Sequence, residues 1–235
     1  MHNSAAVIAR TLERWQAYFT SGYNELILVE NGSTDLTWPL VQELAHDSAH
    51  LKIVLLQSEK GMGNALRAGI QASRGTRILL SADDLPFDFD DLKEARKLAS
   101  LPPLVIGSKA HAQSRVSRAR TRHVFTAFFR AMRVFVLRSE VGDSQGTVLV
   151  DGAWARAMSH RLTEPGFLFT TQLIFAAEAQ NLEVVEVPVR LSREHAPKKT
   201  TVRWADTWRM GSGLFRLRGQ ASALSIPPEV AVPNA

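Results

Sequence analysis

Short apolar runs alternate with longer amphipathic segments along most of this chain. Runs rich in Leu, Ile and Val predict β-strands, whereas segments with apolar residues every three or four positions predict helices. In the first half the pattern predicts a strand at 25–30, a helix at 36–45, a strand at 51–56, a helix at 63–73 and a strand at 77–80. Such alternation is typical of a parallel sheet covered by helices, whose ligands collect at the carboxyl ends of the strands. We therefore expect the loops after these strands to carry the chemistry.

The alternation is looser in the second half. It predicts strands at 104–107, 146–150 and 182–189, a short helix that begins near 88–91, a basic helix at 117–137 and a helix near 170–180. The character of the chain changes after His195, and three prolines between 227 and 233 predict a mobile end. We expect a main domain at 1–195, a basic amphipathic helical segment at 196–224 and a flexible tail at 225–235.

The composition narrows the class of protein. The 235 residues are 45% hydrophobic and 22% charged, as in ordinary globular proteins. The absence of cysteine excludes a disulfide scaffold, a thiolate metal site and a cysteine nucleophile. The longest stretch without Asp, Glu, Lys or Arg, 165–177, is shorter than the roughly 20 apolar residues that cross a bilayer. Residues 1–4 lack the features of a secretory signal, so we expect a cytoplasmic location.

The charge of the chain is positive, with a formal net charge of +5 at pH 7. Such a charge favours anionic partners such as nucleotides, phospholipid headgroups or nucleic acid. The basic residues gather at 115–138 and 190–218, whereas the acidic residues lie mostly outside these stretches. This segregation indicates anion-binding surfaces, although solvated helix faces would give the same pattern. A nucleic-acid-binding protein is the less favoured alternative, because no nucleic-acid-binding motif accompanies the arginines.

Three loops at predicted strand ends carry candidate site residues. The first, 29–35, reads Val-Glu-Asn-Gly-Ser-Thr-Asp. Its glycine lets the backbone approach a ligand closely, and Glu30 or Asp35 offers a carboxylate to a base or a ribose. A plain cap of the next helix would explain the same residues.

The other two loops add a glycine pair and an acidic pair. In the second loop, 58–66, Gly61 and Gly63 open a helix whose backbone N–H groups can face an anion, although the loop is neither a Walker loop nor a three-glycine dinucleotide fingerprint. The third loop, 80–86, places Asp83 and Asp84 where a strand leaves the sheet, so that one or both can ligate Mg²⁺ or Mn²⁺ beside a diphosphate. Solvated or helix-capping carboxylates are the alternative.

The order and spacing of these loops resemble family 2 glycosyltransferases of the GT-A fold, in the branch of dolichyl- or polyprenyl-phosphate sugar synthases. Further matches are VIGSK at 105–109, DSQG at 143–146 and EVPV at 186–189, and the resemblance covers about residues 2–195. It implies an α/β, Rossmann-like GT-A fold with a mostly parallel sheet flanked by helices. It also implies an enzyme that moves a hexose from a UDP- or GDP-linked sugar to polyprenyl or dolichyl phosphate, with inversion and with Mg²⁺ or Mn²⁺ as cofactor.

The resemblance also implies roles for individual residues. Asp84 would hold the divalent ion on the diphosphate, and Arg118 and Arg122 would meet phosphates of donor or acceptor. Asp143 and Gln145 would line the sugar or acceptor side, so Arg118, Asp143 and Gln145 are the candidate catalytic residues. Asp143 would act as base for a hydroxyl acceptor, whereas an anionic lipid phosphate needs no strong base. The residues expected to border the nucleotide and its sugar are Asn3, Glu30, Gly32, Ser33, Asp35, Gly61, Gly63 and Asp83.

Some positions depart from the resembled pattern. Ala82 stands where the first carboxylate of the metal motif is usual, Val148 where a lysine is common, and Thr170 and Gln172 where acidic residues are usual. A different acceptor would explain these changes. So would a nucleotide-sugar-binding relative without turnover that works as an interaction module.

The family's first strand, which normally lies inside the sheet, has no counterpart before residues 2–4. Its absence is expected to leave backbone groups and apolar helix surface uncovered. A start codon assigned too late or a shortened chain would explain this, so restoring upstream residues is expected to raise stability and nucleotide affinity.

Residues 201–218 mix Trp204, Trp208 and Phe215 with arginines at a spacing compatible with a helix. This composition suits an interfacial helix that contacts the inner face of the membrane peripherally. The resembled branch often has a juxtamembrane helix at this place. A helix packed on the domain, or on the second subunit of a homodimer, is the alternative.

Overall fold

A computed structural model describes residues 1–115, 120–192 and 204–228, although not the side chains of 120–126, 128 and 204–210. The described chain divides into two compact units. The first consists of residues 1–85 and 150–169, together with residue 228, and the second of residues 86–149 and 170–227. The division of the chain at residues 195 and 224 stays a prediction.

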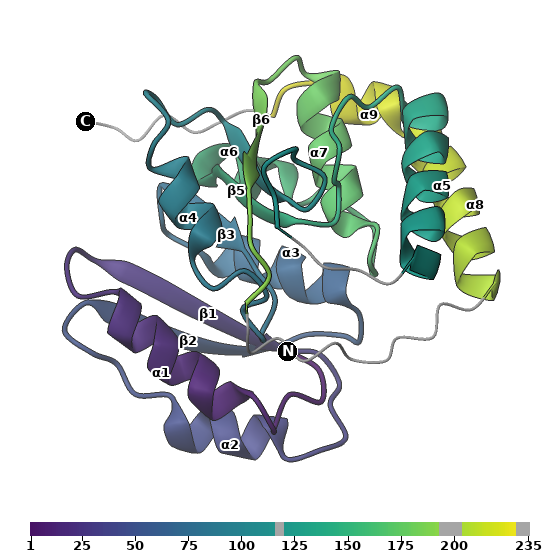
Figure 1. Cartoon of the computed structure of the whole chain (residues 1–235). Coiled ribbons are helices and arrows are strands. Elements are labelled where there is room, and N and C mark those ends of the chain that lie inside the picture. The colour runs from purple at the N-terminus through teal and green to yellow at the C-terminus, as the bar shows by residue number, and fades with distance from the viewer. Residues whose placement is uncertain (116–119, 193–203, 229–235) are drawn as a thin grey trace. The chain divides into compact units, whose positions relative to one another are not determined.

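The first unit is built on two parallel strands with helices on both faces. Strands β1 (Asn24–Glu30) and β2 (Leu51–Gln57) pair in register, with Asn24 opposite Leu51. Helices α1 (Ile8–Tyr18) and α2 (Thr37–Leu44) lie together on one side of this pair (Figure 1). Helix α3 (Met62–Ala72) packs against both strands. The unit also contains β3 (Arg77–Leu80) and α6 (Gly152–Met158).

The alternation of side chains along β1 explains this sandwich. Successive residues of a strand point to opposite faces. Leu28 therefore joins a cluster with Ile8 and Leu12 of α1 and Val41 of α2. Val29 faces the other way, where its Cγ2 atom lies 3.5 Å from the place that a β-carbon on Gly69 would take.

The edge of β1 that faces away from β2 is paired at one point, by Met1. The amino nitrogen of Met1 donates to the Val29 carbonyl (2.7 Å), and the Asn31 N–H donates to the Met1 carbonyl (3.0 Å). These two bonds have the form of a parallel ladder on either side of Glu30. Among the described residues, β2 is the one strand that pairs with β1.

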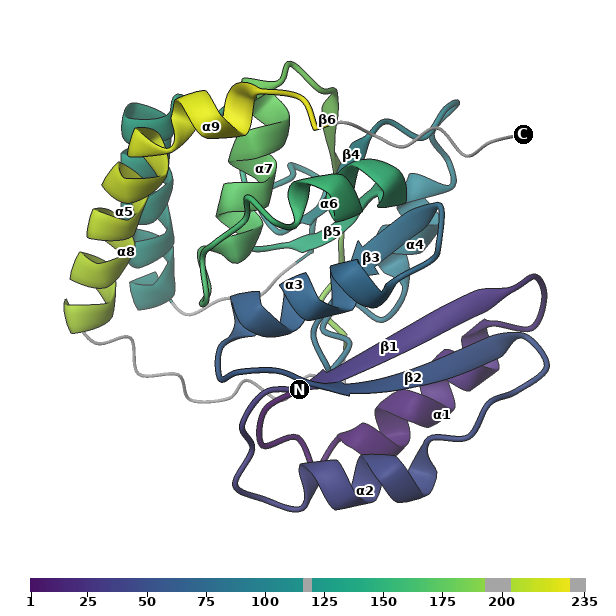
Figure 2. The same ribbon diagram turned by 180° about the vertical axis from the view of Figure 1, so that it is seen from behind.

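The second unit holds a parallel strand pair and a group of helices. Strand β4 (Leu104–Ser108) pairs in parallel with β6 (Val184–Pro188), with Leu104 opposite Val184. Strand β5 (Thr147–Asp151) begins in this unit. The helices are α4 (Asp90–Ala95), α5 (Arg120–Leu137), α7 (Phe169–Ala179), α8 (Trp204–Gly219) and α9 (Ala221–Ser225). Figure 2 shows α8 and α9 from behind.

A buried arginine ties the end of α5 to the following loop. The Arg133 side chain is 1% exposed and donates to the Ser139 hydroxyl and to the Val141 carbonyl. Burial lowers its pKa, while the carboxylates of Glu178 and Glu186 act in the opposite direction. Arg133 is therefore an internal group, although the sequence places it within a basic stretch.

Candidate active site

The loop after β1 is organised by the carboxylate of Glu30. This side chain is 4% exposed and accepts hydrogen bonds from the backbone N–H of Ser33 and from Nε2 of Gln57 (3.1 Å). Gly32 lies between Glu30 and Ser33 in the chain. Its φ is 77°, a backbone conformation that is strained for any residue with a β-carbon. Burial on its own would raise the pKa of Glu30, but the hydrogen bonds from Ser33 and Gln57 outweigh it and lower that pKa.

The start of the chain joins the same loop. The Asn3 N–H donates to Ser33 Oγ (3.0 Å), and Asn3 Oδ1 accepts from the Thr34 N–H (2.8 Å). Asp35 lies just before α2 and accepts from the backbone N–H of Thr37 (3.0 Å) as well as from its hydroxyl. The hydrogen bond from the Thr37 hydroxyl is the main cause that lowers the pKa of Asp35. Asp35 thus organises the start of α2, as the capping interpretation anticipates.

The second loop adjoins the first. The Ser58 N–H donates to the Glu30 carbonyl (2.9 Å), and a β-carbon on Gly32 would lie 3.4 Å from Cβ of Lys60. These contacts place 58–61 directly beside the loop that follows β1.

The two glycines of the second loop are required by the chain's own backbone. A β-carbon on Gly61, whose φ is 134°, would lie 2.3 Å from the Pro165 carbonyl oxygen, and one on Gly63 would lie 2.1 Å from that of Glu164. The N–H groups of Gly63 (2.9 Å) and Asn64 (3.3 Å) both donate to the Pro165 carbonyl. These two amides are therefore engaged within the protein. That Gly61 and Gly63 also border a nucleotide stays a prediction.

The acidic loop after β3 is joined to the first loop through Ser4. Ser4 is 2% exposed, and its hydroxyl donates to Oδ2 of Asp83 while its N–H donates to Oγ1 of Thr37 (2.7 Å). The Asp83 carbonyl accepts from the Thr11 hydroxyl of α1 (2.7 Å). The carboxylate of Asp83 is thus fixed by Ser4, and half-buried Asp84 follows it in the chain.

The acidic loop suits a divalent cation that is shared with a substrate. Among the described residues, no group of three or more His, Asp and Glu side chains is arranged to hold a metal. Mg²⁺ and Mn²⁺ favour oxygen ligands, and Mg²⁺ is commonly bound through one or two carboxylates together with substrate phosphates. Asp83 and Asp84 supply ligands of this kind at the end of β3. The donor set therefore fits an ion completed by a diphosphate, rather than a cage made by the protein alone.

The three loops thus gather within the first unit. The first loop touches the second through Glu30 and Ser58, and it is linked to the third through Thr37, Ser4 and Asp83. Sequence reasoning identified the loops but did not propose Ser4, Gln57 or Lys60 as site residues. A polar residue at the end of β2 was the available signal for Gln57.

The candidates Asp143 and Gln145 lie in the second unit and are held by Lys109. Asp143 Oδ2 accepts from the Lys109 N–H (2.9 Å) and forms an ion pair with Lys109 Nζ (3.2 Å). Lys109 Nζ also donates to the Gln145 carbonyl (2.7 Å), and the Gln145 N–H donates to Asp143 Oδ1 (2.9 Å). Glu186 accepts from the Asp143 N–H (3.0 Å). The Asp143 carboxylate is therefore an ion-paired group that orders the loop before β5.

The two remaining candidates are Arg118 and Arg122. Arg118 lies outside the described residues, and the structure gives the backbone of Arg122 in α5 but not its side chain.

The positions that depart from the resembled pattern are mostly buried. Val148 and Gln172 are 0% exposed, and Thr170 is 5% exposed. Gln172 Nε2 donates to Gln220 Oε1 (2.8 Å), and the Thr170 hydroxyl donates to the Ser144 carbonyl (2.8 Å). The polar side chains of Thr170 and Gln172 are thus hydrogen-bonded inside the second unit, where an unpaired charge would be costly.

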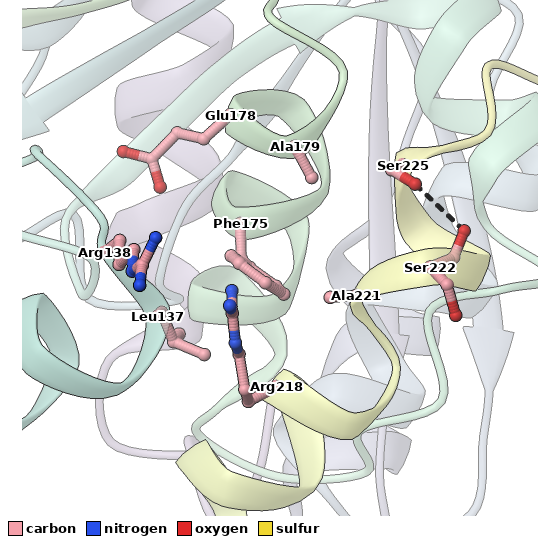
Figure 3. Close-up of a pocket in the computed structure, with 9 residues that line it drawn as sticks. All are labelled: Leu137, Arg138, Phe175, Glu178, Ala179, Arg218, Ala221, Ser222 and Ser225. Atoms are coloured by element: carbon pink, nitrogen blue, oxygen red, sulfur yellow. Dashed lines mark hydrogen bonds between the residues drawn. The ribbon is translucent and has the colours of Figure 1, made fainter.

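The second unit also contains a pocket of about 310 Å³ between the end of α5, α7 and the α8–α9 corner (Figure 3). Its lining includes Arg138, Glu178 and Arg218 around the ring of Phe175. Of the predicted site residues whose side chains the structure describes, none lines this pocket.

Comparison with known proteins identifies sequence relatives. The profile described as "Glycosyl transferase family 2" matches residues 1–159. The chain is 27% identical over 221 residues to a dolichyl-phosphate beta-glucosyltransferase of Mus musculus, covering 88% of this chain and 67% of that one. It is 30% identical over 212 residues to the Drosophila melanogaster protein of the same name, covering 82% of this chain and 62% of that one. The chain therefore spans about two thirds of the length of these relatives.

The fold also matches solved structures. Glucosyl-3-phosphoglycerate synthase from Mycobacterium tuberculosis, in complex with Mn²⁺, UDP-glucose and phosphoglyceric acid, superposes with a TM-score of 0.59 at 16% identity. The superposition covers 97% of this chain and 79% of that one. This likeness confirms the predicted α/β fold of the GT-A type, with a parallel sheet flanked by helices.

Proposed function

Because the chain belongs to glycosyl transferase family 2, we propose that it transfers glucose from a nucleoside diphosphate sugar to the phosphate of a polyprenyl or dolichyl lipid. The relatives named dolichyl-phosphate beta-glucosyltransferase support both the sugar and the acceptor class. The synthase of similar fold that is solved with UDP-glucose and Mn²⁺ supports UDP as the nucleotide. Because the proposed acceptor is a lipid, the proposed place of action is a membrane. We propose its cytoplasmic face.

One observation carries this proposal: the loops after β1, β2 and β3 meet in the first unit, with two adjacent carboxylates in the third loop. In α/β proteins, ligands bind at the carboxyl ends of the strands. A nucleoside diphosphate needs polar groups for its base and ribose and a countercharge for its phosphates. Glu30 and Ser33 supply polar groups within one hydrogen-bonded cluster, and Asp83, itself an anion, supplies countercharge only through a cation that it helps to bind.

The proposed mechanism assigns binding and positioning to these residues. Glu30 holds the loop after β1 in shape, so that Gly32 and Ser33 can contact the nucleoside. Asp84, with Asp83 fixed by Ser4, would hold a divalent cation, which supplies countercharge for the departing diphosphate. The acceptor phosphate is already anionic, so attack on the anomeric carbon requires no strong base. An attack on the face opposite the nucleotide inverts the anomeric centre.

The ion pair between Lys109 and Asp143 bears on the role of the second unit. A carboxylate that is held by Lys109 Nζ is poorly placed to remove a proton. This agrees with an anionic acceptor better than with a hydroxyl acceptor. Asp143 and Gln145 are therefore proposed as residues that position the sugar or acceptor, together with Arg118 and Arg122 as phosphate-binding cations.

A transfer assay tests the proposal. The chain is incubated with radiolabelled UDP-glucose, Mg²⁺ or Mn²⁺ and a short polyprenyl phosphate, and the organic phase is counted. Label is expected there with the wild type and is expected to be lost with Asp84→Ala. Glu43→Gln, an exposed acidic residue of α2, serves as the matched control and is expected to retain transfer. Absence of transfer with any nucleotide sugar, despite a folded chain, would contradict the proposed activity.

The changed positions favour one second candidate, a relative that binds nucleotide sugar without turnover. Ala82, Val148 and Gln172 replace charged residues that the resembled pattern carries. Metal-dependent binding of UDP-glucose without release of UDP, with or without lipid phosphate, would select this second function.

A further inference from the structure

The pocket of the second unit is made of residues that the proposed nucleotide site does not use. Its nine lining residues all belong to this unit, and none comes from the loops after β1, β2 and β3. Its volume of about 310 Å³ lies at the lower end of the range of about 300–1,000 Å³ for small-molecule sites. The pocket therefore suits a small ligand rather than an extended one.

The lining of the pocket combines buried apolar side chains with exposed polar ones. Leu137 and Phe175 are 3% and 4% exposed and belong to the core. Arg138, Arg218 and Ser222 are exposed and line the same pocket (Figure 3). Sites for small molecules commonly join an apolar surface to a few polar groups that fix the orientation of the ligand.

The two arginines carry charge that their surroundings leave unpaired. Among the described residues, neither Arg138 nor Arg218 has a side-chain hydrogen bond or an ion pair. Arg138 directly follows α5, and Arg218 lies in the last turn of α8. Two cations on the wall of one pocket create a positive field that attracts an anion.

Glu178, the carboxylate of the pocket lining, is engaged elsewhere. Its Oε1 accepts from the Glu140 N–H (3.0 Å), and its Oε2 is buried. Burial lowers the pKa of Arg133, and Glu178 is first among the carboxylates that act to raise it. The charge of Glu178 is thus opposed by buried Arg133, so it does not cancel the charges of Arg138 and Arg218.

The backbone of Arg138 is a second sign that its side chain has a role. Its φ is 57°, in the left-handed region that glycine commonly occupies at the end of a helix. A residue with a β-carbon is strained there, and residues strained in this way cluster at ligand sites. Glycine would suit the fold at this position, whereas arginine also brings a charge to the pocket.

A phosphorylated sugar matches these groups. A phosphate monoester carries a charge of about −1.5 to −2 at neutral pH, and guanidinium groups bind it through paired hydrogen bonds. The hydroxyl of Ser222 can donate to or accept from a sugar hydroxyl. The ring of Phe175 offers apolar surface to the carbon skeleton.

We propose that the pocket binds a small sugar phosphate, with the phosphate between Arg138 and Arg218 and the sugar beside Phe175 and Ser222. Inorganic phosphate and the phosphate of a lipid share part of this chemistry, so the experiment separates these sources. The proposal goes beyond the proposed transfer reaction and does not depend on it.

Calorimetric titration of the full chain at fixed ionic strength tests the proposal. The titrants are glucose 6-phosphate, glucose and inorganic phosphate, and a short polyprenyl phosphate is the competitor. The variants are Arg138→Gln and Arg218→Gln. Arg130→Gln, which removes an exposed arginine of α5 outside the pocket lining, is the matched control. Arg138→Gly separates loss of binding from loss of folding, because glycine relieves the left-handed backbone.

The wild type is expected to bind glucose 6-phosphate more tightly than inorganic phosphate and not to bind glucose. Arg138→Gln and Arg218→Gln are each expected to weaken binding about tenfold or more. Arg130→Gln is expected to bind like the wild type. Arg138→Gly is expected to lose as much affinity as Arg138→Gln, while its melting temperature stays the same or rises.

Four results would overturn the proposal. The first is no binding of glucose 6-phosphate, or binding no tighter than that of glucose or of inorganic phosphate. The second is wild-type affinity in Arg138→Gln or in Arg218→Gln. The third is an equal loss in Arg130→Gln, because binding would then follow the overall charge of the chain. The fourth is displacement of the sugar phosphate by the polyprenyl phosphate, which would assign the pocket to a lipid.

Discussion

Replacement of Gly63 by Ala tests whether the second loop is shaped by the chain's own backbone. In an ordinary helix this change would stabilise the protein by about 1 kcal/mol, because Gly is a poor helix former. Here the new β-carbon would lie 2.1 Å from the Glu164 carbonyl oxygen and 2.8 Å from the Pro165 carbonyl carbon. Both are backbone atoms, so α3 or the 164–165 segment must move.

The cost follows from the bonds that such a movement breaks. The N–H groups of Gly63 and Asn64 both donate to the Pro165 carbonyl, and each hydrogen bond contributes about 1 kcal/mol. Overpacking adds about 1–3 kcal/mol. With the helix preference subtracted, the free energy of unfolding is expected to fall by about 2–4 kcal/mol.

Gly69→Ala in the same helix is the matched control. Its β-carbon would meet Cγ2 of Val29 at 3.5 Å, an ordinary contact, so this variant is expected to gain about 0.5–1 kcal/mol. Urea denaturation of both variants measures the difference. If Gly63→Ala proved as stable as Gly69→Ala, this result would contradict the close packing of α3 against the backbone of residues 164–165.

Three further predictions concern the cluster of loops. Ser4→Ala removes the donor to Asp83 and is expected to lower the free energy of unfolding by about 1–2 kcal/mol in urea melts, whereas Ser222→Ala, an exposed serine of α9, should leave it nearly unchanged. The pKa of Glu30 is lowered on folding, so its contribution to stability is present above the ordinary value of 4.5 and is lost as the pH falls through the lower folded value. Glu30→Gln should flatten this acid limb of a melting-temperature profile, and an unchanged profile would refute the assignment. A strand-forming segment placed before Met1 is expected to continue the parallel pairing with β1 and to raise both the melting temperature and nucleotide affinity; no change in either would contradict this.

The strands were predictable because their signal is local. Apolar runs bounded by polar residues and glycines predict β1, β2 and β3 to within a residue or so. Helix α1 was not predicted, although its buried residues Ile8, Leu12 and Trp15 follow helical spacing. The partners of Ile8 and Leu12 lie on β1 and α2, and the importance of the spacing shows only once that packing is known.

The site was predictable as a set of loops but not as a set of contacts. The hydrogen bond from Ser4 to Asp83 joins residues 79 positions apart, and that from Gln57 to Glu30 joins residues 27 positions apart. Sequence spacing cannot show such pairs. Sequence spacing also cannot show whether a glycine makes room for a ligand or for a neighbouring segment of backbone. Gly63 makes room for the backbone of Glu164.

Calorimetric titration with UDP-glucose tests the central claim most directly. The claim is that the loops after β1, β2 and β3 form one site for a nucleoside diphosphate sugar, with a divalent cation at Asp84. The account predicts binding that requires Mn²⁺ or Mg²⁺ and that is lost in Asp84→Ala but kept in Glu43→Gln. Metal-independent binding that Asp84→Ala leaves at full strength, or no binding of any nucleotide sugar by the folded chain, would contradict it.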